Sequence, residues 1–300
     1  MRRLLACALL ALLACGLPAA AQERIRVVAS FSILADLVRN VGGDRVEVAA
    51  LIGRNEDSHA FEPSPADSRR IADAQLVVVN GLGFEGWLDR LVRAAGSKAP
   101  VVVASAGVQP REIAGDETRL ARDRAGVDPH AWQSVANARL YVANIRDALI
   151  RVDPAGQATY AANAGAYLAK LDALDQEIPD TLAKIPADRR RVITSHDAFG
   201  YFADAYGIGF FAPAGLSTGA EPSALAVARI IRRIRSERIG ALFLENVVDP
   251  RLVQLIARET GARIGGTLYS DALTGPDGPA PTYLDMMRRN VQELAAALGG

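Results

Sequence analysis

The sequence predicts an α/β protein with two parallel-sheet lobes joined by one long rigid helix. Short runs rich in valine, isoleucine and leucine alternate with helical patterns, which is typical of parallel α/β folds. Landmarks of the first half recur in the second half at a nearly constant shift, and one long apolar stripe lies between the halves. At 300 residues the chain has room for one large domain or for two of moderate size.

The first 21 residues are expected to form a removable signal peptide. A basic start at Arg2 and Arg3 precedes an uninterrupted apolar run over 4–14, and small residues up to Ala21 supply a cleavage site. The apolar run has 11 residues, whereas a membrane-spanning helix needs about 20. We therefore expect an exported protein cleaved after Ala21. The alternative is a lipoprotein, because Cys15 ends a loose lipobox.

The composition excludes several classes of protein. The 34 Lys and Arg residues balance 34 Asp and Glu residues, so no basic surface for nucleic acid is expected. Both cysteines, Cys7 and Cys15, fall in the expected leader, and the mature chain then has no cysteine and a net charge of −2. Only three histidines are present, so any imidazole chemistry must use nearly all of them.

An N-terminal α/β lobe is predicted over 22–150. A helical pattern over 33–41 follows its first strand. The expected strands cover residues 26–30, 46–52, 76–80 and 101–105.

A C-terminal α/β lobe is predicted over 186–300, because the same plan recurs there. Three landmarks recur at a shift of 165 positions: 192–195 after 27–30, 242–245 after 77–80, and Ser270 after Ser105. A Glu-Pro-Ser sequence also recurs, at 62–64 and at 221–223. Single matches arise by chance, but this ordered set indicates two lobes of one design.

A linking helix is predicted over 154–179. Its apolar residues are spaced by four and three positions in turn, which places them on one helical face, and Pro154 and Pro179 suit its first turn and its end. At about 1.5 Å per residue the helix is roughly 37 Å long and could join the lobes as a stiff strut. The alternative is an ordinary helix of one lobe. The apolar residues are Tyr160, Ala164, Tyr167, Leu171, Leu174 and Ile178.

The three histidines lie where an α/β fold binds ligands, in loops at the carboxyl ends of parallel strands. His59 follows the second strand, His196 follows the first strand of the second lobe, and His130 precedes a helix in a turn-forming sequence. The repeat places Asp271 after the last strand of the second lobe. All four are predicted to meet in the interlobe cleft, where three imidazoles and a carboxylate suit Zn(II) or a similar divalent ion.

Four further acids lie close enough in sequence to support these ligands by hydrogen bonds: Asp57, Asp128, Asp197 and Glu221. The alternative is that each histidine is a capping or surface residue. For one histidine alone, a capping or surface role is the better interpretation than a ligand role. For all three histidines together, in loops that face the cleft, a ligand role is the better one.

Two short motifs suggest other functions. The segment 81–86 matches a dinucleotide-binding fingerprint, but it follows the third strand and contains Glu85, which would repel a pyrophosphate. The segment 215–219 matches a nucleophile elbow, but no histidine follows Ser217 in the chain. We interpret the first as a tight turn between a strand and a helix, and a serine hydrolase is not expected.

The sequences around the four predicted ligands resemble the metal-binding motifs of the zinc/manganese solute-binding proteins of bacterial ABC importers. The motifs are Asp-Ser-His59-Ala-Phe-Glu-Pro, Asp-Pro-His130-Ala-Trp, Ser-His196-Asp-Ala-Phe-Gly and Tyr-Ser-Asp271-Ala-Leu, and they occur in the right order over essentially the whole mature chain. The resemblance implies two α/β lobes joined by a long helix, with His59, His130, His196 and Asp271 as metal ligands.

The resemblance also implies a function in transport and no enzymatic activity. The protein would be a periplasmic monomer that binds Zn(II) as its transported substrate and delivers it to an ABC permease of the inner membrane. Manganese-selective members generally carry Glu at the place of His196, which favours zinc here. Many zinc-selective members insert a His-rich loop ahead of the second ligand. In this chain the corresponding residues, 111–127, contain no histidine. Manganese or iron therefore stays an alternative.

Two other classes of protein have less support in the sequence. A zinc hydrolase keeps a coordination position open for water, whereas here four protein side chains would fill a tetrahedral site. No His-Glu-x-x-His motif is present either. An adhesin has no separate support in the sequence.

Overall fold

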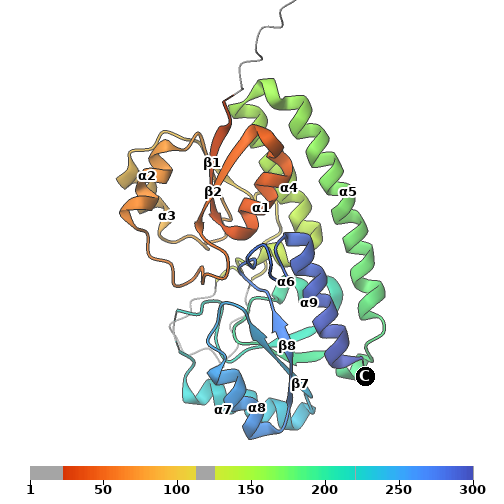
Figure 1. The fold of residues 1–300 in the computed structure, drawn as a ribbon. Coiled ribbons are helices and arrows are strands. Elements are labelled where there is room, and N and C mark those ends of the chain that lie inside the picture. The colour runs from red at the N-terminus through yellow and green to blue at the C-terminus, as the bar shows by residue number, and fades with distance from the viewer. Residues whose placement is uncertain (1–22, 113–125, 220, 300) are drawn as a thin grey trace, which may run out of the picture.

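The computed structural model describes residues 23–112, 126–219 and 221–299. Two four-stranded parallel sheets lie one beyond the other along the molecule, and long helices run beside both of them (Figure 1). The predicted fold class is confirmed. The predicted signal peptide and Cys15 lie outside the described residues.

The first sheet has the strand order β2-β1-β3-β4, with every neighbouring pair parallel. Successive side chains point to opposite faces, so Val77 packs against α2 and α3 on the outer face while Val78 joins the core on the inner face with α1. The elements are β1 (Ile25–Phe31), α1 (Ser32–Gly42), β2 (Val46–Ile52), α2 (Pro65–Asp73), β3 (Leu76–Val79), α3 (Leu88–Ala95) and β4 (Val101–Val103).

The second sheet repeats this arrangement, with the order β6-β5-β7-β8. The first, second, third and fourth strands along the chain occupy corresponding places in the two sheets, as the repeat predicted. The Glu-Pro-Ser sequences have matching roles, because the Ser64 and Ser223 hydroxyls accept bonds from backbone amides at the starts of α2 and α7. The elements are β5 (Arg191–Ile193), α6 (Gly200–Tyr206), β6 (Gly209–Phe211), α7 (Ala224–Glu237), β7 (Ala241–Glu245), α8 (Arg251–Thr260), β8 (Arg263–Leu268) and α9 (Tyr283–Leu298).

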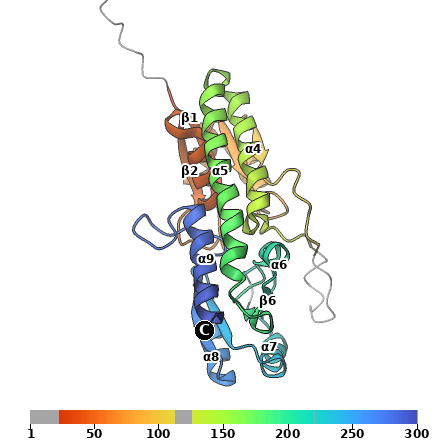
Figure 2. The ribbon, with the colours of Figure 1, turned by 90° about the vertical axis from the view of Figure 1, so that its right-hand side faces the viewer.

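Between the sheets the chain forms α4 (Val135–Val152) and the 26-residue α5 (Gln157–Leu182), which runs along the length of the molecule beside α9 (Figure 2). All six apolar residues of the predicted stripe are buried. The prediction that Pro179 ends the helix was wrong. A proline removes only the hydrogen bond from its own nitrogen, and the next turn still closes, because Ala183 N donates to Pro179 O at 2.8 Å.

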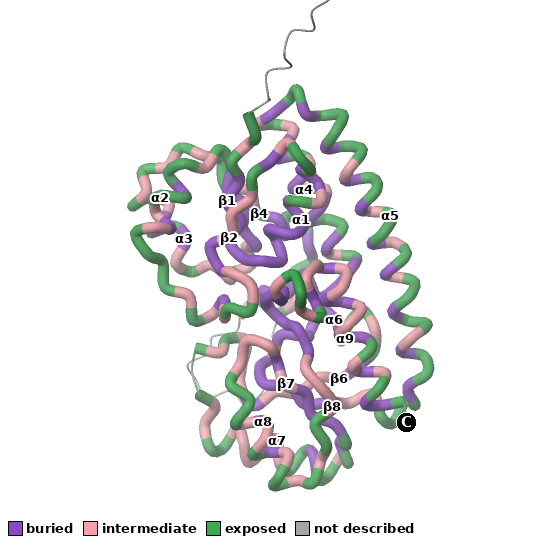
Figure 3. The backbone as a smooth tube through the Cα atoms, in the orientation of Figure 1, coloured by how far each residue is buried: buried purple, intermediate pink, exposed green. Residues whose placement is uncertain are grey.

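One hydrophobic core runs through both lobes. It contains buried side chains of the inner faces of both sheets and of α1, α4, α5, α6 and α9, among them Phe31, Tyr141, Leu171, Phe202, Phe243 and Tyr283. The buried stretches of the chain accordingly continue from one sheet to the other (Figure 3). Two smaller cores lie on the outer faces, under α2–α3 and under α7–α8. In the described part of the chain, no helix is both long and apolar enough to cross a membrane.

Candidate metal centre

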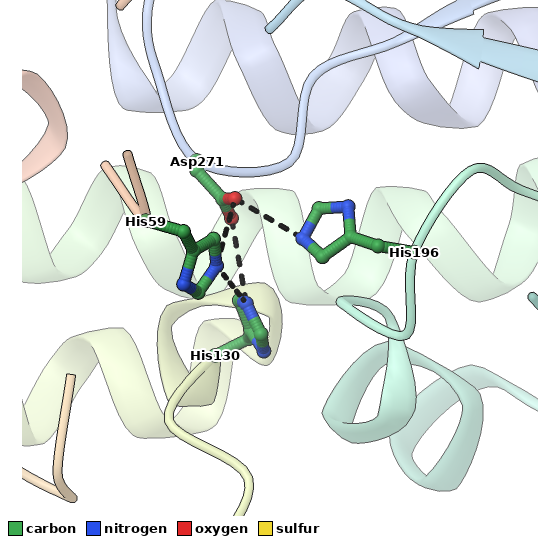
Figure 4. A group of neighbouring side chains, drawn as sticks. All are labelled: His59, His130, His196 and Asp271. Atoms are coloured by element: carbon green, nitrogen blue, oxygen red, sulfur yellow. Dashed lines mark hydrogen bonds and ion pairs between the residues drawn. The ribbon is translucent and has the colours of Figure 1, made fainter. Parts of the chain in front are cut away.

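The four predicted ligand side chains lie together and point toward one another (Figure 4). One ligand atom from each of His59, His130, His196 and Asp271 lies within 4.8 Å of all the others. The Asp271 carboxylate is 3.1 Å from His196 Nε2, 3.4 Å from His59 Nε2 and 3.6 Å from His130 Nε2. The His59 and His130 Nε2 atoms are 3.3 Å apart.

Each of these side chains comes from a loop, and three of the loops follow parallel strands. His59 lies between β2 and α2, His196 lies between β5 and α6, and Asp271 follows β8. His130 directly precedes the short 3₁₀ helix Ala131–Gln133, which leads into α4. The carboxyl ends of both sheets therefore contribute to the same place, as expected from the topology.

The His130 ring is held by Asp128. Asp128 Oδ1 accepts bonds from His130 Nδ1 at 2.8 Å and from the His130 backbone amide at 2.9 Å. Arg111 Nη1 lies 3.4 Å from the other oxygen of the same carboxylate. A proton on Nδ1 leaves the Nε2 lone pair free and directed toward the centre of the site, which is the arrangement of a metal-ligating histidine.

The His196 ring is held by Glu245, a residue that the sequence interpretation missed. Glu245 Oε2 lies 2.7 Å from His196 Nδ1, and Glu245 Oε1 accepts the Ser195 and His196 backbone amides at 2.8 and 3.0 Å. Burial alone would lower the pKa of His196, but the charges of Glu245 and Asp271 outweigh it and raise this pKa well above its ordinary value. The signal was available, since Glu245 ends β7 beside β5.

Asp271 is fully buried, and hydrogen bonds fix its loop from the other side. Trp132 Nε1 and Gln133 Nε2 each donate to Ser270 O at 2.8 Å, and Leu273 N donates to Ser32 Oγ at 3.0 Å. Burial would raise the pKa of Asp271, but the charges of His196 and His130 hold it well below its usual range.

The donor atoms fit a divalent cation. Among the residues that the structure describes, neither Asp271 carboxylate oxygen has a hydrogen-bond donor in good geometry, although both are buried, and such buried unpaired acceptors are costly. For metal–ligand distances near 2.05 Å, the edge of a regular tetrahedron is about 3.3 Å. Asp271 Oδ2 lies 3.1 Å from His196 Nε2 and 3.4 Å from His59 Nε2, and the His59 and His130 Nε2 atoms are 3.3 Å apart, which is close to that value; the whole set of four ligand atoms lies within 4.8 Å. An ion among the four atoms would satisfy them together.

The other predicted supporting acids have different positions. Asp57 accepts the His59 backbone amide at 2.9 Å, and so contacts a predicted ligand. Glu221 lines a cavity of about 550 Å³ that opens beside His196 and is also bordered by Asp57 and Thr218. Asp197 contributes to the charge around Arg111. Of the four acids, Asp128 and Asp57 therefore support ligands directly.

The two other motifs have structural roles. Glu85 accepts the backbone amides of Asn80 and Gly81 at 2.6 and 3.0 Å, so it occupies the donors that a phosphate would need. Ser217 Oγ accepts the Gly219 amide at 3.1 Å. All three histidines of the chain are in the candidate metal centre, so none is available to activate Ser217.

Comparison with known proteins agrees with this site. A family model described as "Zinc-uptake complex component A periplasmic" matches residues 27–297. The chain belongs to this family. Its members are non-enzymatic, metal-binding solute-binding components of ABC importers, and they work on the outer side of the cytoplasmic membrane as periplasmic proteins or lipoproteins. This chain therefore binds a divalent metal for import, with an ABC permease as its partner.

Individual relatives are named for different metals. The manganese-binding lipoprotein MntA of Halalkalibacterium halodurans is 34% identical over 92% of this chain and 89% of its own length. The iron-binding protein YfeA of Yersinia pestis is 33% identical over 94% and 89%. The solved structure of the periplasmic zinc-binding protein TroA of Treponema pallidum aligns with a TM-score of 0.85 at 28% identity, over 93% of this chain and all of that one.

Proposed function

We propose that this member of the family captures Zn(II) in the periplasm and delivers it to an ABC permease of the inner membrane. The observation that carries the proposal is the donor set of three imidazole nitrogens and one carboxylate in a buried site. The proposal keeps His59, His130, His196 and Asp271 as the metal ligands. It also keeps 1–21 as the signal peptide, 22–150 and 186–300 as the lobes, and a monomeric state. The linking helix predicted over 154–179 is kept with the bounds of α5, Gln157–Leu182.

The chemistry of the ligands favours zinc over manganese. Imidazole suits Zn(II), whereas carboxylate, carbonyl and water oxygens suit Mn(II). Here the nitrogens outnumber the carboxylate ligands by three to one. Glu245 and Asp128 lie behind the rings of His196 and His130, so these carboxylates act on the metal through imidazole and do not coordinate it themselves. A manganese- or iron-binding member is the second candidate, because relatives above 30% identity are named for those metals.

The experiment that tests this function is metal analysis of protein purified from the periplasm, followed by competition titration of the metal-free protein with Zn(II) and Mn(II). We expect zinc in the purified protein and a preference for zinc in the competition. His59→Ala and His130→Ala should each lower zinc affinity sharply, because a metal bound by four ligands would lose one of them. Glu221→Gln is the matched control, because Glu221 lines the neighbouring cavity without contacting a ligand.

Exchange of the distinguishing ligand tests the choice of metal. His196→Glu replaces a nitrogen by a carboxylate and should shift the preference toward manganese. An unchanged ranking of the two metals in this variant would mean that position 196 does not set the selectivity. Manganese or iron in the purified wild-type protein, together with weak zinc binding, would overturn the zinc assignment in favour of the second candidate.

A further inference from the structure

His59 differs from the other three ligands in how it is held. Its side chain is 8% exposed, whereas those of His130, His196 and Asp271 are fully buried. The Nδ1 atoms of His130 and His196 each face a carboxylate, but among the described residues the His59 Nδ1 has no such partner. The His59 ring packs edge-on against Phe84, with 5.3 Å between the ring centroids, and its position otherwise follows that of its loop.

That loop is fixed at both ends. At its start, Arg54 Nη1 donates to the Thr274 and Pro281 carbonyls, and Asn55 N donates to Leu273 O at 2.9 Å. At its end, Ser64 forms a reciprocal capping box with Asp67 at the start of α2. The residues between these ends, 56–63, carry His59.

One side-chain hydrogen bond ties the middle of this loop to the opposite lobe. Thr218 Oγ1 donates to Asp57 Oδ2 at 2.6 Å, while Asp57 Oδ1 accepts the His59 amide at 2.9 Å. A single carboxylate thus joins the backbone of a predicted ligand to a hydroxyl of the second lobe. We call this the Asp57–Thr218 contact.

The segment that carries Thr218 is itself bonded to the segment of His196. Asp197 N donates to Gly215 O at 2.9 Å, and Ala214 N donates to Ser195 O at 3.4 Å. The Asp57–Thr218 contact therefore links the loop of one ligand to the backbone around another.

The contact also borders the opening beside the site. Asp57, Thr218 and His196 all line the cavity of about 550 Å³. His130 and Asp271 do not line it and are covered by the shared core and its hydrogen bonds. His59 does not line the cavity either, so the cavity reaches the site at His196, beside the Asp57–Thr218 contact.

We propose that Thr218 is a positioning residue for His59: through Asp57 it holds the His59 loop closed over the metal and so slows metal release into the cavity. This inference rests on the proposed function of the site as a metal-capture centre. It assigns separate roles to the four ligands. His130, His196 and Asp271 form a pre-arranged set, and His59 completes the site when the contact forms.

The test measures the rates of zinc binding and release in the full-length mature protein. Thr218→Val keeps the shape of the side chain and removes the hydroxyl, while Thr218→Ser keeps the hydroxyl. Zinc-loaded protein is mixed with excess chelator to obtain the dissociation rate, and metal-free protein is mixed with Zn(II) to obtain the association rate. A hydrogen bond to a charged group is stronger than one between neutral groups, so we expect Thr218→Val to release zinc at least about tenfold faster.

The controls separate this role from a general effect on the loop. Ser217→Ala removes a neighbouring exposed hydroxyl that does not touch Asp57 and should release zinc at the wild-type rate, as should Thr218→Ser. Adding Asp57→Ala to Thr218→Val should change the rate less than Asp57→Ala does alone, because the partner is already absent. Thermal melts of the metal-free variants should match the wild type.

Two results would overturn the inference: an unchanged dissociation rate in Thr218→Val, or equal acceleration in Ser217→Ala. Either result, with tight zinc binding by the wild-type protein, would leave the proposed function in place. Failure of the wild-type protein to bind zinc would instead contradict the proposed function itself.

Discussion

At the scale of single residues, the candidate metal centre depends on the atoms behind the ligands. His130 and His196 each present Nε2 to the centre because a carboxylate takes the opposite ring nitrogen. Two buried carboxylates facing two imidazoles fix the tautomer and also make each ring a stronger donor to a cation. Burial opposes the charged form of His196, but the charges of Glu245 and Asp271 outweigh it and raise the pKa of this ring.

Glu245→Gln tests this support for the ligands. A Gln side chain keeps an oxygen for the Ser195 and His196 amides, but its NH₂ group cannot accept a proton from His196 Nδ1. The loss of such a partner typically lowers metal affinity by about 10- to 100-fold. We expect zinc affinity, measured by competition with a chelator, to fall within that range while zinc stays preferred over manganese.

Glu237→Gln is a control for the removal of one carboxylate from the second lobe. Glu237 is bonded to Arg191 and Arg233 near the surface, and it does not touch the metal centre. The zinc affinity of the Glu237→Gln variant should equal that of the wild type. Wild-type affinity in Glu245→Gln would mean that the 2.7 Å approach to His196 has no part in metal binding.

The sequence predicted the four clustered side chains because their positions follow from topology. His59, His196 and Asp271 each follow a parallel strand, so their convergence depends on strand order and not on side-chain detail. Glu245 also ends such a strand, but its role requires knowing that β7 lies next to β5. The contact between Asp57 and Thr218 spans 161 positions, and nothing in either local sequence indicates it.

At the scale of elements, the long helix shows what periodicity predicts and what it does not. The apolar spacing identified the buried face of α5, because burial repeats with the helical turn. Its end was harder to predict. Pro179 removes one hydrogen bond, and Arg190 then bonds the carbonyls of Leu182 and Ile185, which satisfies the last turn from a residue further along the chain.

Gly165 in α5 offers a test of the helix alone. It is exposed, and a Cβ atom there would have no heavy atom within 4 Å. Gly165→Ala should therefore raise the free energy of unfolding by about 0.5–1 kcal/mol, measured by urea denaturation, because alanine loses less backbone entropy in a helix. Zinc affinity should not change, since Gly165 lies outside the metal centre.

Gly156, directly before α5, is the contrasting position. A Cβ atom there would lie 2.4 Å from Tyr160 and 2.6 Å from Asp153 Oδ2. Gly156→Ala should lower the free energy of unfolding, because the buried surroundings must shift. Stabilisation by Gly156→Ala, or destabilisation by Gly165→Ala, would contradict the described packing around α5.

At the scale of the whole molecule, the two lobes are not independent bodies. The inner faces of both sheets share one core with α1, α4, α5, α6 and α9, so a wide rotation of one sheet away from the other would expose buried apolar surface. Within the described ranges, separate cores lie under the outer layers, α2–α3 and α7–α8. The loops next to these layers, 56–63 and 212–219, contain Asp57 and Thr218.

This arrangement predicts a local opening of the site in place of a hinge motion. Small-angle scattering of the metal-free and zinc-loaded protein should give the same radius of gyration within error, because the shared core stays intact. Amide hydrogen exchange should slow on zinc binding mainly in 56–63 and 212–219, the segments joined by the Asp57–Thr218 contact, while α4 and α5 stay equally protected in both forms. A clear contraction in scattering, or exchange changes along α5, would show that the core itself rearranges and that zinc closes the molecule by moving whole lobes.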